Sequence, residues 1–154
     1  MTFSIAGRCA KSGAFGVAIT TSSIAVGARC PHARAKVGAV ATQNVTDPNL
    51  GPLLLDYMEK GMSAPEAVAA VVHDRPFADY RQLTAVDSQG RSATWSGKNI
   101  LGTHGVSEQR DCVAAGNLLK HASLPKTMTD AFAANADQHL AERLLRALEA
   151  GLDS

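Results

Sequence analysis

The fold of this chain is decided near its start, by the stretches Phe3-Ser4-Ile5-Ala6-Gly7-Arg8-Cys9, Lys11-Ser12-Gly13 and Gly16-Val17-Ala18-Ile19-Thr20-Thr21. The first and last stretches have strand character, and the glycine-containing segment between them is typical of a turn. The sequence therefore predicts an antiparallel hairpin that begins almost at the N-terminus.

Further strands and helices follow in blocks. We expect extended segments at 24–30, which Pro31 ends, and at 37–42, 82–86, 92–95 and 111–115. A helical stripe begins at Leu50 and stops at Gly61, a capping box at Ser63 and Glu66 opens a helix through Val72, and a last helix covers about 127–150. This order predicts an α+β domain, with antiparallel sheet layers covered by helices over residues 1–154.

Composition excludes several classes of protein. The chain has 154 residues, 45% hydrophobic and 19% charged, with a formal net charge of +1, as in an ordinary globular domain. Nucleic acids and anionic membranes need concentrated positive charge, so neither is an expected partner. Three distant cysteines (Cys9, Cys30, Cys112) suit reduced thiols, and no signal peptide is evident, so we expect a cytoplasmic protein.

Thr2 is the candidate nucleophile. It is a small hydroxyl residue directly after the initiator Met1, which aminopeptidases remove before small residues. Removal would leave a threonine next to its own α-amine, whose ordinary pKa of about 7.7–8.0 suits a general base near neutral pH. Threonine activated by its own terminal amine is a known nucleophile design. A retained Met1 would turn this amine into a peptide nitrogen and remove the base.

The hairpin register predicts the neighbours of Thr2. If the turn is centred between Ser12 and Gly13, Thr2 lies opposite Ser23. A slip of one residue brings Ser22 opposite instead and reverses the faces of one strand. Ser22 and Ser23 are therefore the hydroxyls expected to orient the Thr2 amine or hydroxyl.

The chain resembles a family of uncharacterised prokaryotic proteins of the N-terminal-nucleophile (Ntn) hydrolase superfamily, the domain of unknown function one thousand and twenty-eight. The resemblance covers nearly the whole chain and is strongest in the first half. The matching stretches are Thr2-Phe3-Ser4-Ile5, Gly16-Val17-Ala18, Ala25-Val26-Gly27-Ala28, Ala33-Arg34-Ala35, Val37-Gly38-Ala39-Val40-Ala41-Thr42-Gln43, Gly51-Pro52, Tyr80-Arg81-Gln82-Leu83 and Gly116-Asn117-Leu118-Leu119.

This resemblance implies a four-layer αββα sandwich. Family members usually continue with strand-forming sequence after the long helix, so we expect this chain to lack C-terminal strands, as a truncated form or as one product of a cleavage. The chain start is also similar to that of a catalytic proteasome subunit, but Ser22 and Ser23 stand where that subunit has an acidic residue. The resemblance implies no particular substrate.

Four further side chains are candidate site residues. The amides of Gln43, expected to follow a strand, and Asn117, expected in a turn, are suited to donate to a developing oxyanion. His104, in a loop, and Arg81 are candidates for substrate contact. The segment Cys30-Pro31-His32 lacks the paired ligands of a zinc site, so no metal is expected.

Two functions remain open at this stage. The first is Ntn-type hydrolysis of a small amide, ureido or peptide-like C–N bond, with Thr2, Ser22, Ser23 and Asn117 as catalytic residues and no cofactor. The second is a non-catalytic binding or assembly protein that keeps the same scaffold. We expect a small-molecule ligand and self-association into homo-oligomers in either case.

Overall fold

The computed structural model describes residues 1–154 and consists of two four-stranded antiparallel sheets with four α-helices. In spatial order, the first sheet contains β2 (Phe15–Thr21), β1 (Thr2–Arg8), β8 (Cys112–Asn117) and β7 (Gly105–Gln109). The second sheet contains β3 (Pro31–Arg34), β4 (Gly38–Asn44), β5 (Arg81–Asp87) and β6 (Ser92–Ser96). The helices are α1 (Leu50–Glu59), α2 (Ala64–Val72), α3 (Leu124–Ala134) and α4 (Leu140–Leu152), with short 3-10 turns η1 (Val26–Ala28) and η2 (Ala78–Tyr80).

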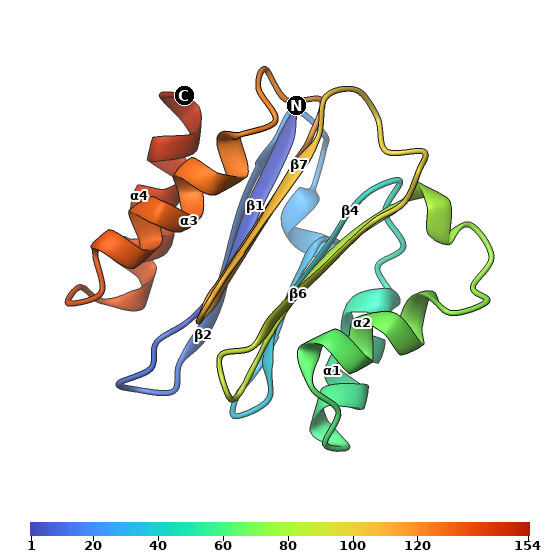
Figure 1. Ribbon diagram of the computed structural model, residues 1–154, viewed down its shortest axis with the longest axis horizontal. Coiled ribbons are helices and arrows are strands. Elements are labelled where there is room, and N and C mark those ends of the chain that lie inside the picture. The colour runs from blue at the N-terminus through green and yellow to red at the C-terminus, as the bar shows by residue number, and fades with distance from the viewer.

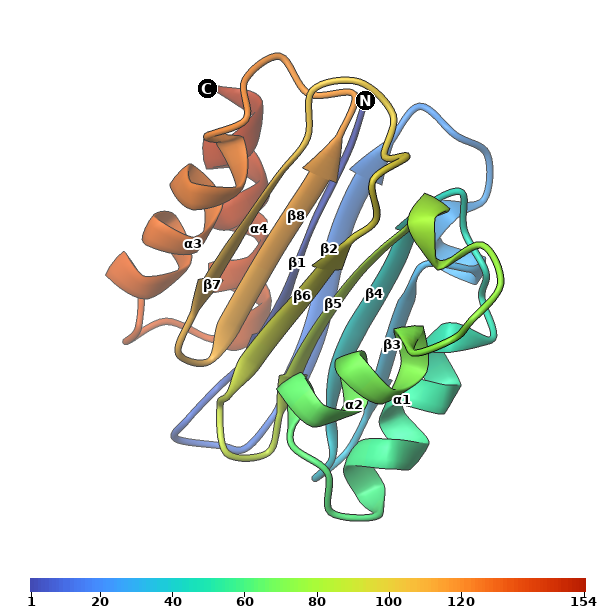
Figure 2. The same ribbon diagram turned by 45° about the vertical axis from the view of Figure 1, so that its right-hand side comes forward.

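The elements form four layers, as Figures 1 and 2 show. Helices α3 and α4 cover the outer face of the first sheet, and α1 and α2 cover the outer face of the second. The two sheets face each other across the middle of the molecule. The predicted α+β class is therefore confirmed. None of the helices combines the length and the apolar character needed to cross a membrane.

Three apolar clusters hold these layers together. One lies between the second sheet and its helices, around Leu54 and Leu83, and another lies between the first sheet and its helices, around Phe3 and Phe132. A smaller cluster of short side chains, including Ala6 and Ala39, joins the two sheets. Because the side chains of a strand alternate between faces, each sheet supplies residues to an outer and to a central cluster.

Several local predictions are confirmed. Helix α1 begins at Leu50 and buries Leu54 and Met58 on one stripe. Helix α2 begins with the expected capping box: Ser63 accepts from the Glu66 backbone, and the Glu66 carboxylate accepts from the Ser63 backbone. Each of these features depends on side chains only three or four residues apart, so the sequence specifies them locally.

The segment around Pro31 was predicted wrongly. Residues 24–30 are not an extended strand, because they contain bends and η1, and Ala25 has a φ of 54°. Pro31 begins β3 instead of ending a strand. A proline is tolerated there because β3 is an edge strand and Pro31 is its first residue.

The C-terminal half contains two further differences. The expected helix over 127–150 is two helices, with a break at residues 135–139. The Asn135 amide donates to the Ala131 carbonyl near the end of α3, and His139 caps the start of α4, so polar side chains replace the continuous backbone ladder. Strand β7 was not predicted. It is an edge strand with Val106 as its one large apolar residue, so it has no period-two hydrophobic signal.

Candidate functional site

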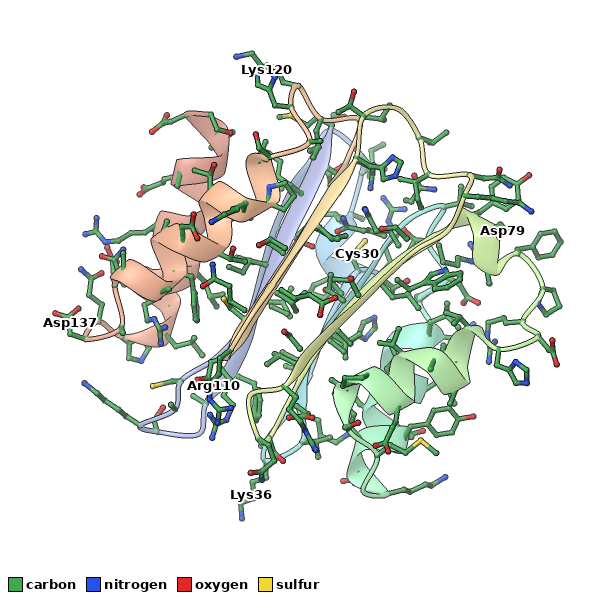
Figure 3. The ribbon with its side chains drawn as sticks, in the orientation of Figure 1. Cys30, Lys36, Asp79, Arg110, Lys120 and Asp137 are labelled. Atoms are coloured by element: carbon green, nitrogen blue, oxygen red, sulfur yellow. The ribbon has the colours of Figure 1, made fainter.

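The strand ends around Thr2 enclose a small polar cavity. Its volume is about 40 Å³, room for a reacting group rather than a whole substrate. Two of its nine lining residues are hydrophobic, one is positively charged and none is acidic. Both sheets and the connection between β2 and β3 contribute, and Figure 3 shows Cys30 between the two sheets. The lining consists of Thr2, Thr21, Ser23, Val26, Arg29, Cys30, Gln43, Asn44 and Thr46.

The Thr2 hydroxyl belongs to a hydrogen-bonded path along this cavity. Thr2 Oγ1 lies 2.8 Å from Thr21 Oγ1, which also accepts from the Ser23 backbone N–H at 3.1 Å. Ser23 Oγ in turn accepts from Arg29 Nη2 at 2.6 Å. The candidate nucleophile and a guanidinium group are therefore connected through only two residues.

The predicted register of the first hairpin is wrong by two residues. Thr2 pairs with Thr21, not with Ser23 or Ser22. The turn occupies the four residues between Cys9 and Ala14 and is centred between Lys11 and Ser12 rather than one position later. Gly13 adopts the left-handed conformation at the last position of this turn, with φ of 72°.

With this register, Ser22 and Ser23 have different positions relative to the cavity. Ser22 lies in an exposed bend after β2 and does not line the cavity. Ser23 remains at the cavity, where its backbone and hydroxyl join Thr21 to Arg29. Thr21, which the sequence reasoning missed, is the hydroxyl that contacts Thr2.

Neutral side chains bridge the two sheets beside the cavity. Ser4 Oγ donates to Gln43 Oε1 at 2.7 Å, and Gln43 Nε2 donates to Gln82 Oε1 at 2.8 Å. Asn117 Nδ2 donates to the same Gln82 oxygen at 3.1 Å. All four residues are at most 3% exposed. Buried amides with their partners in place hold one geometry, because breaking any bond would leave a polar group unsatisfied.

Gln82 is the centre of this network. Its Nε2 donates to Ser96 Oγ at 3.1 Å and to the Gly116 carbonyl at 3.2 Å, so both ends of the side chain are occupied. From the sequence, Gln82 was expected to begin a strand and belonged to a stretch that matches the family, but it was not a candidate site residue. A signal was present: Gln82 precedes Leu83, Ala85 and Val86 in the same strand, and a polar residue in a buried strand needs partners.

Gln43 and Asn117 lie differently with respect to Thr2. Asn117 pairs with Thr2 across β1 and β8, but it does not line the cavity. Gln43 comes from the opposite sheet and does line it. Each amide nitrogen carries two protons and gives one to Gln82, so a second donor remains on each. Gln43 is thus the better placed of the two to contact a group inside the cavity.

Cys30 is a second nucleophilic side chain at the cavity. It is 2% exposed, and its Sγ lies 3.8 Å from Thr46 Oγ1. Burial raises the pKa of the Cys30 thiol, against the smaller lowering effects of Thr46 and of the Arg29 charge. Since the thiolate is the reactive form, a buried neutral thiol is a poor nucleophile, and Thr2 is the stronger candidate.

Arg81 and His104 lie outside the cavity lining. Arg81 donates through Nη1 to the Val45 carbonyl and so ties the segment after β4 to the start of β5. His104 is exposed in the loop before β7, and its Nδ1 lies 3.1 Å from the Gly102 carbonyl. The structure therefore does not bring these two residues together with Thr2, and contact with substrate stays a prediction for both.

Loops at this end of the sheets expose large apolar side chains. Backbone hydrogen bonds join the loops in pairs, Val45 to Tyr80 and Leu118 to Leu101. Six of the eleven exposed large hydrophobic residues of the chain lie here: Met1, Ile24, Val45, Tyr80, Leu101 and Leu118. Apolar groups around a polar cavity are a common feature of binding sites.

A comparison with protein-family models shows the family of this chain. The model of the family of unknown function DUF1028 matches residues 2–154. The chain belongs to this family. The resemblance stated from the sequence is therefore confirmed at the level of the family. A comparison with curated proteins found no match.

A solved structure of the DUF1028 family has the same architecture. The crystal structure of protein SPO2555 from Silicibacter pomeroyi, which is assigned to the DUF1028 family, superposes on this chain with a TM-score of 0.92 at 32% sequence identity. The match covers 99% of this chain and 70% of that protein. The two facing sheets and their helices are therefore shared within the DUF1028 family.

A larger hollow of about 830 Å³ lies elsewhere on this DUF1028 chain, between α2 and the edge strand β6. Half of its twelve lining residues are hydrophobic. The Ser92 hydroxyl there donates to the Gln109 carbonyl, and the Thr94 hydroxyl donates to Glu108 at 2.5 Å. Because this groove contains neither Thr2 nor the buried amides, we regard the smaller cavity as the candidate reaction site. No group of three or more His, Cys, Asp or Glu side chains converges as a metal site does.

Proposed function

We propose that this chain is an Ntn-type hydrolase that cleaves a small amide, ureido or peptide-like C–N bond, with Thr2 as its nucleophile. The observation that carries the proposal is the position of the Thr2 hydroxyl: it lines a polar cavity at the start of a strand in the middle of a sheet. Met1 precedes that strand and is 45% exposed, so an aminopeptidase can reach it.

The layered arrangement supports this proposal. We infer that the order helices, sheet, sheet, helices is the αββα sandwich of the Ntn-hydrolase superfamily. In such a sandwich the nucleophile begins a central strand at one end of the facing sheets, and Thr2 begins β1, which lies between β2 and β8. The family resemblance and the position of Thr2 thus support the same assignment.

The proposed reaction uses the free amine of Thr2 as the base. After removal of Met1, this amine takes the hydroxyl proton while Oγ1 attacks the carbonyl carbon of the substrate. The tetrahedral oxyanion accepts a hydrogen bond from the second Nε2 proton of Gln43, with Asn117 as the other predicted donor. Collapse expels the amine product, which takes the proton from the α-ammonium group. Water, deprotonated by the same amine, then hydrolyses the Thr2 ester.

A covalent probe tests this proposal without knowledge of the substrate. A β-lactone opens on an N-terminal threonine and leaves a stable ester, so we expect one adduct, mapped to Thr2, on protein from the native host. Thr2→Ala should remove the adduct, and Thr2→Ser should retain it. Thr20→Val is the matched control. Thr20 precedes Thr21 in β2, and successive side chains of a strand point to opposite faces, so Thr20 does not line the cavity.

Intact mass and periodate oxidation report the state of the N-terminus. Periodate cleaves only a threonine with a free α-amine, so the processed chain should be oxidised at Thr2. Quantitative retention of Met1 in the native host would exclude the free-amine mechanism. An adduct that persists in Thr2→Ala would place the nucleophile elsewhere.

The second candidate is a non-catalytic binding protein. It is favoured by the internal hydrogen bonds of Thr2 and Gln43, which leave few free polar groups in a small cavity. The exposed apolar loops at the same end also suit binding. Processed protein that binds but never acylates at Thr2 would support this alternative.

A further inference from the structure

Arg29 places a positive charge at the cavity of Thr2. It directly follows η1, and its backbone N–H donates to the Val26 carbonyl at 3.2 Å, which fixes the residue at the cavity wall. Its Nη2 donates to Ser23 Oγ at 2.6 Å. The charge also acts on Cys30, on the same wall.

This guanidinium has no carboxylate partner within the chain. The ion pairs of the structure involve other cationic groups, and none includes Arg29. No acidic residue lines the cavity either. Arg29 has five N–H donors in a planar group, and Ser23 accepts from one side of it. The remaining donors match the two oxygens of a carboxylate.

We propose that Arg29 binds a carboxylate of the substrate, so that the substrates of the Thr2 site are amides that carry a carboxylate close to the scissile bond. This inference rests on the proposed function. The path from Thr2 through Thr21 and Ser23 to Arg29 is short, so the carboxylate and the scissile carbonyl must be near each other in the substrate. N-acyl amino acids meet this condition, because only the amide nitrogen and one carbon separate the two groups.

Ser23 is a positioning residue in this scheme. Its hydroxyl holds Nη2 of Arg29, and its backbone N–H holds the Thr21 hydroxyl that contacts Thr2. Ser23→Ala removes only the first of these contacts. It should therefore weaken carboxylate binding by a smaller factor than loss of the guanidinium does.

Equilibrium binding tests the carboxylate site without turnover. The probes are N-acetylglycine and N-acetylglycinamide, which differ only in the carboxylate, and the protein is the Thr2→Ala chain. We expect the acid to bind at least about tenfold more tightly, because hydrogen bonds to charged groups are stronger than hydrogen bonds between neutral groups. Arg29→Gln should abolish this preference, and Arg29→Lys should keep part of it.

Arg110→Gln is the matched control for these variants. Arg110 lies at the opposite end of the sheets, as Figure 3 shows, and takes part in none of the ion pairs. Its substitution should leave the preference for the acid intact. Equal binding of the two probes, or a preference that survives Arg29→Gln in a folded protein, would overturn the proposal.

Labelling of processed protein separates this inference from the proposed function. A β-lactone with a carboxylate side chain should acylate Thr2 at least about tenfold faster than its methyl ester, and Arg29→Gln should equalise the two rates. Equal rates in the unsubstituted protein contradict the role of Arg29 but leave Thr2 as the nucleophile. Failure of both lactones contradicts the proposed function, whereas the binding experiment still decides the carboxylate site.

Discussion

The two ends of the facing sheets differ in the kind of side chain that makes their contacts. At one end, which we call the hairpin end, the four hairpins turn, and charged side chains make contacts within each sheet: Arg8 Nη1 lies 2.6 Å from Asp111 in the first sheet, and Arg91 Nε lies 2.8 Å from Asp87 in the second. At the other end, which we call the Thr2 end, the buried contacts are neutral hydrogen bonds around Gln82, within the second sheet to Gln43 and Ser96 and across to Gly116 and Asn117 of the first sheet.

Because of this difference, the charges named at the hairpin end stabilise the fold, whereas the charge at the Thr2 end is available to a ligand. At the hairpin end the buried carboxylate of Asp87 is paired and receives backbone N–H groups from Ala64, Gln89 and Arg91, so this charge is not free for a ligand. At the Thr2 end the neutral amides fix the geometry, while the Arg29 charge stays unpaired beside a hydroxyl. A site that binds an anion needs such a surplus of positive charge.

The largest expected effect is the loss of Gln82 at the Thr2 end. Gln82→Ala removes four hydrogen bonds and leaves buried groups of Gln43 and Asn117 without their partner. We expect the free energy of unfolding to fall by about 4 kcal/mol, as the sum of unsatisfied polar groups and a cavity. Urea denaturation measures this value. The exposed Gln89 is the control, and Gln89→Ala should cost less than about 0.5 kcal/mol.

A charge substitution at the hairpin end should have the next largest effect. Asp87→Asn puts an amide N–H₂ group where the carboxylate accepts from Ala64 and Arg91. We expect a loss of about 3 kcal/mol, since breaking a buried charged contact leaves its partners unsatisfied. A loss larger than that of Gln82→Ala would reverse the order of the two ends and contradict our comparison.

The pH dependence of stability distinguishes the two ends further. Burial acts to raise the pKa of the Asp87 carboxyl, but hydrogen bonds from Ala64 and Arg91 outweigh it, so the pKa is lower than usual. A carboxyl with a lowered folded-state pKa stabilises the fold above its unfolded pKa of about 3.9 and loses this contribution as the pH falls through the folded value. Asp87→Asn should therefore flatten the acid limb of the stability profile, and Gln82→Ala should not.

How far the sequence predicts the fold depends on whether the information is local. The stripe that begins at Leu50 and the capping box at Ser63 involve neighbours three or four residues apart, and both are confirmed. The break at residues 135–139 was missed because the apolar periodicity of α3 and α4 reads as one stripe across a polar interruption. Strand β7 was missed because an edge strand needs little apolar sequence.

The candidate site depends on contacts between distant parts of the chain. The sequence placed Thr2 at the start of a strand and identified Gln43 and Asn117 as amides of interest. It did not predict that Gln82 joins them, because the contact with Gln43 depends on the register of β4 and β5, and the contact with Asn117 requires the two sheets to face each other in one alignment. The same is true of Arg29, whose position follows from the bends after β2, where we expected a strand.

A smaller effect is expected at Thr21. Thr21→Val keeps the shape of the side chain but removes the oxygen that contacts Thr2 and accepts from Ser23. We expect a loss of about 1 kcal/mol in unfolding free energy and about fivefold slower β-lactone acylation of processed Thr2. The rate is measured by mass spectrometry over time. Thr20→Val is again the control, and equal rates in the two variants would remove Thr21 from the site.

The smallest effect is expected at Ser22, next to Thr21 in sequence. The reason is the register of the β1–β2 hairpin. Thr2 pairs with Thr21, so Ser22 lies just after β2, where it is exposed and does not line the cavity. Ser22→Ala should change the unfolding free energy by less than about 0.5 kcal/mol and leave the acylation rate of Thr2 unchanged. A slower rate in Ser22→Ala than in Thr21→Val would instead support the alternative register, slipped by one residue from the first prediction, in which Ser22 lies opposite Thr2. Because the two positions are adjacent, this pair of variants tests the hairpin alignment at the resolution of one residue.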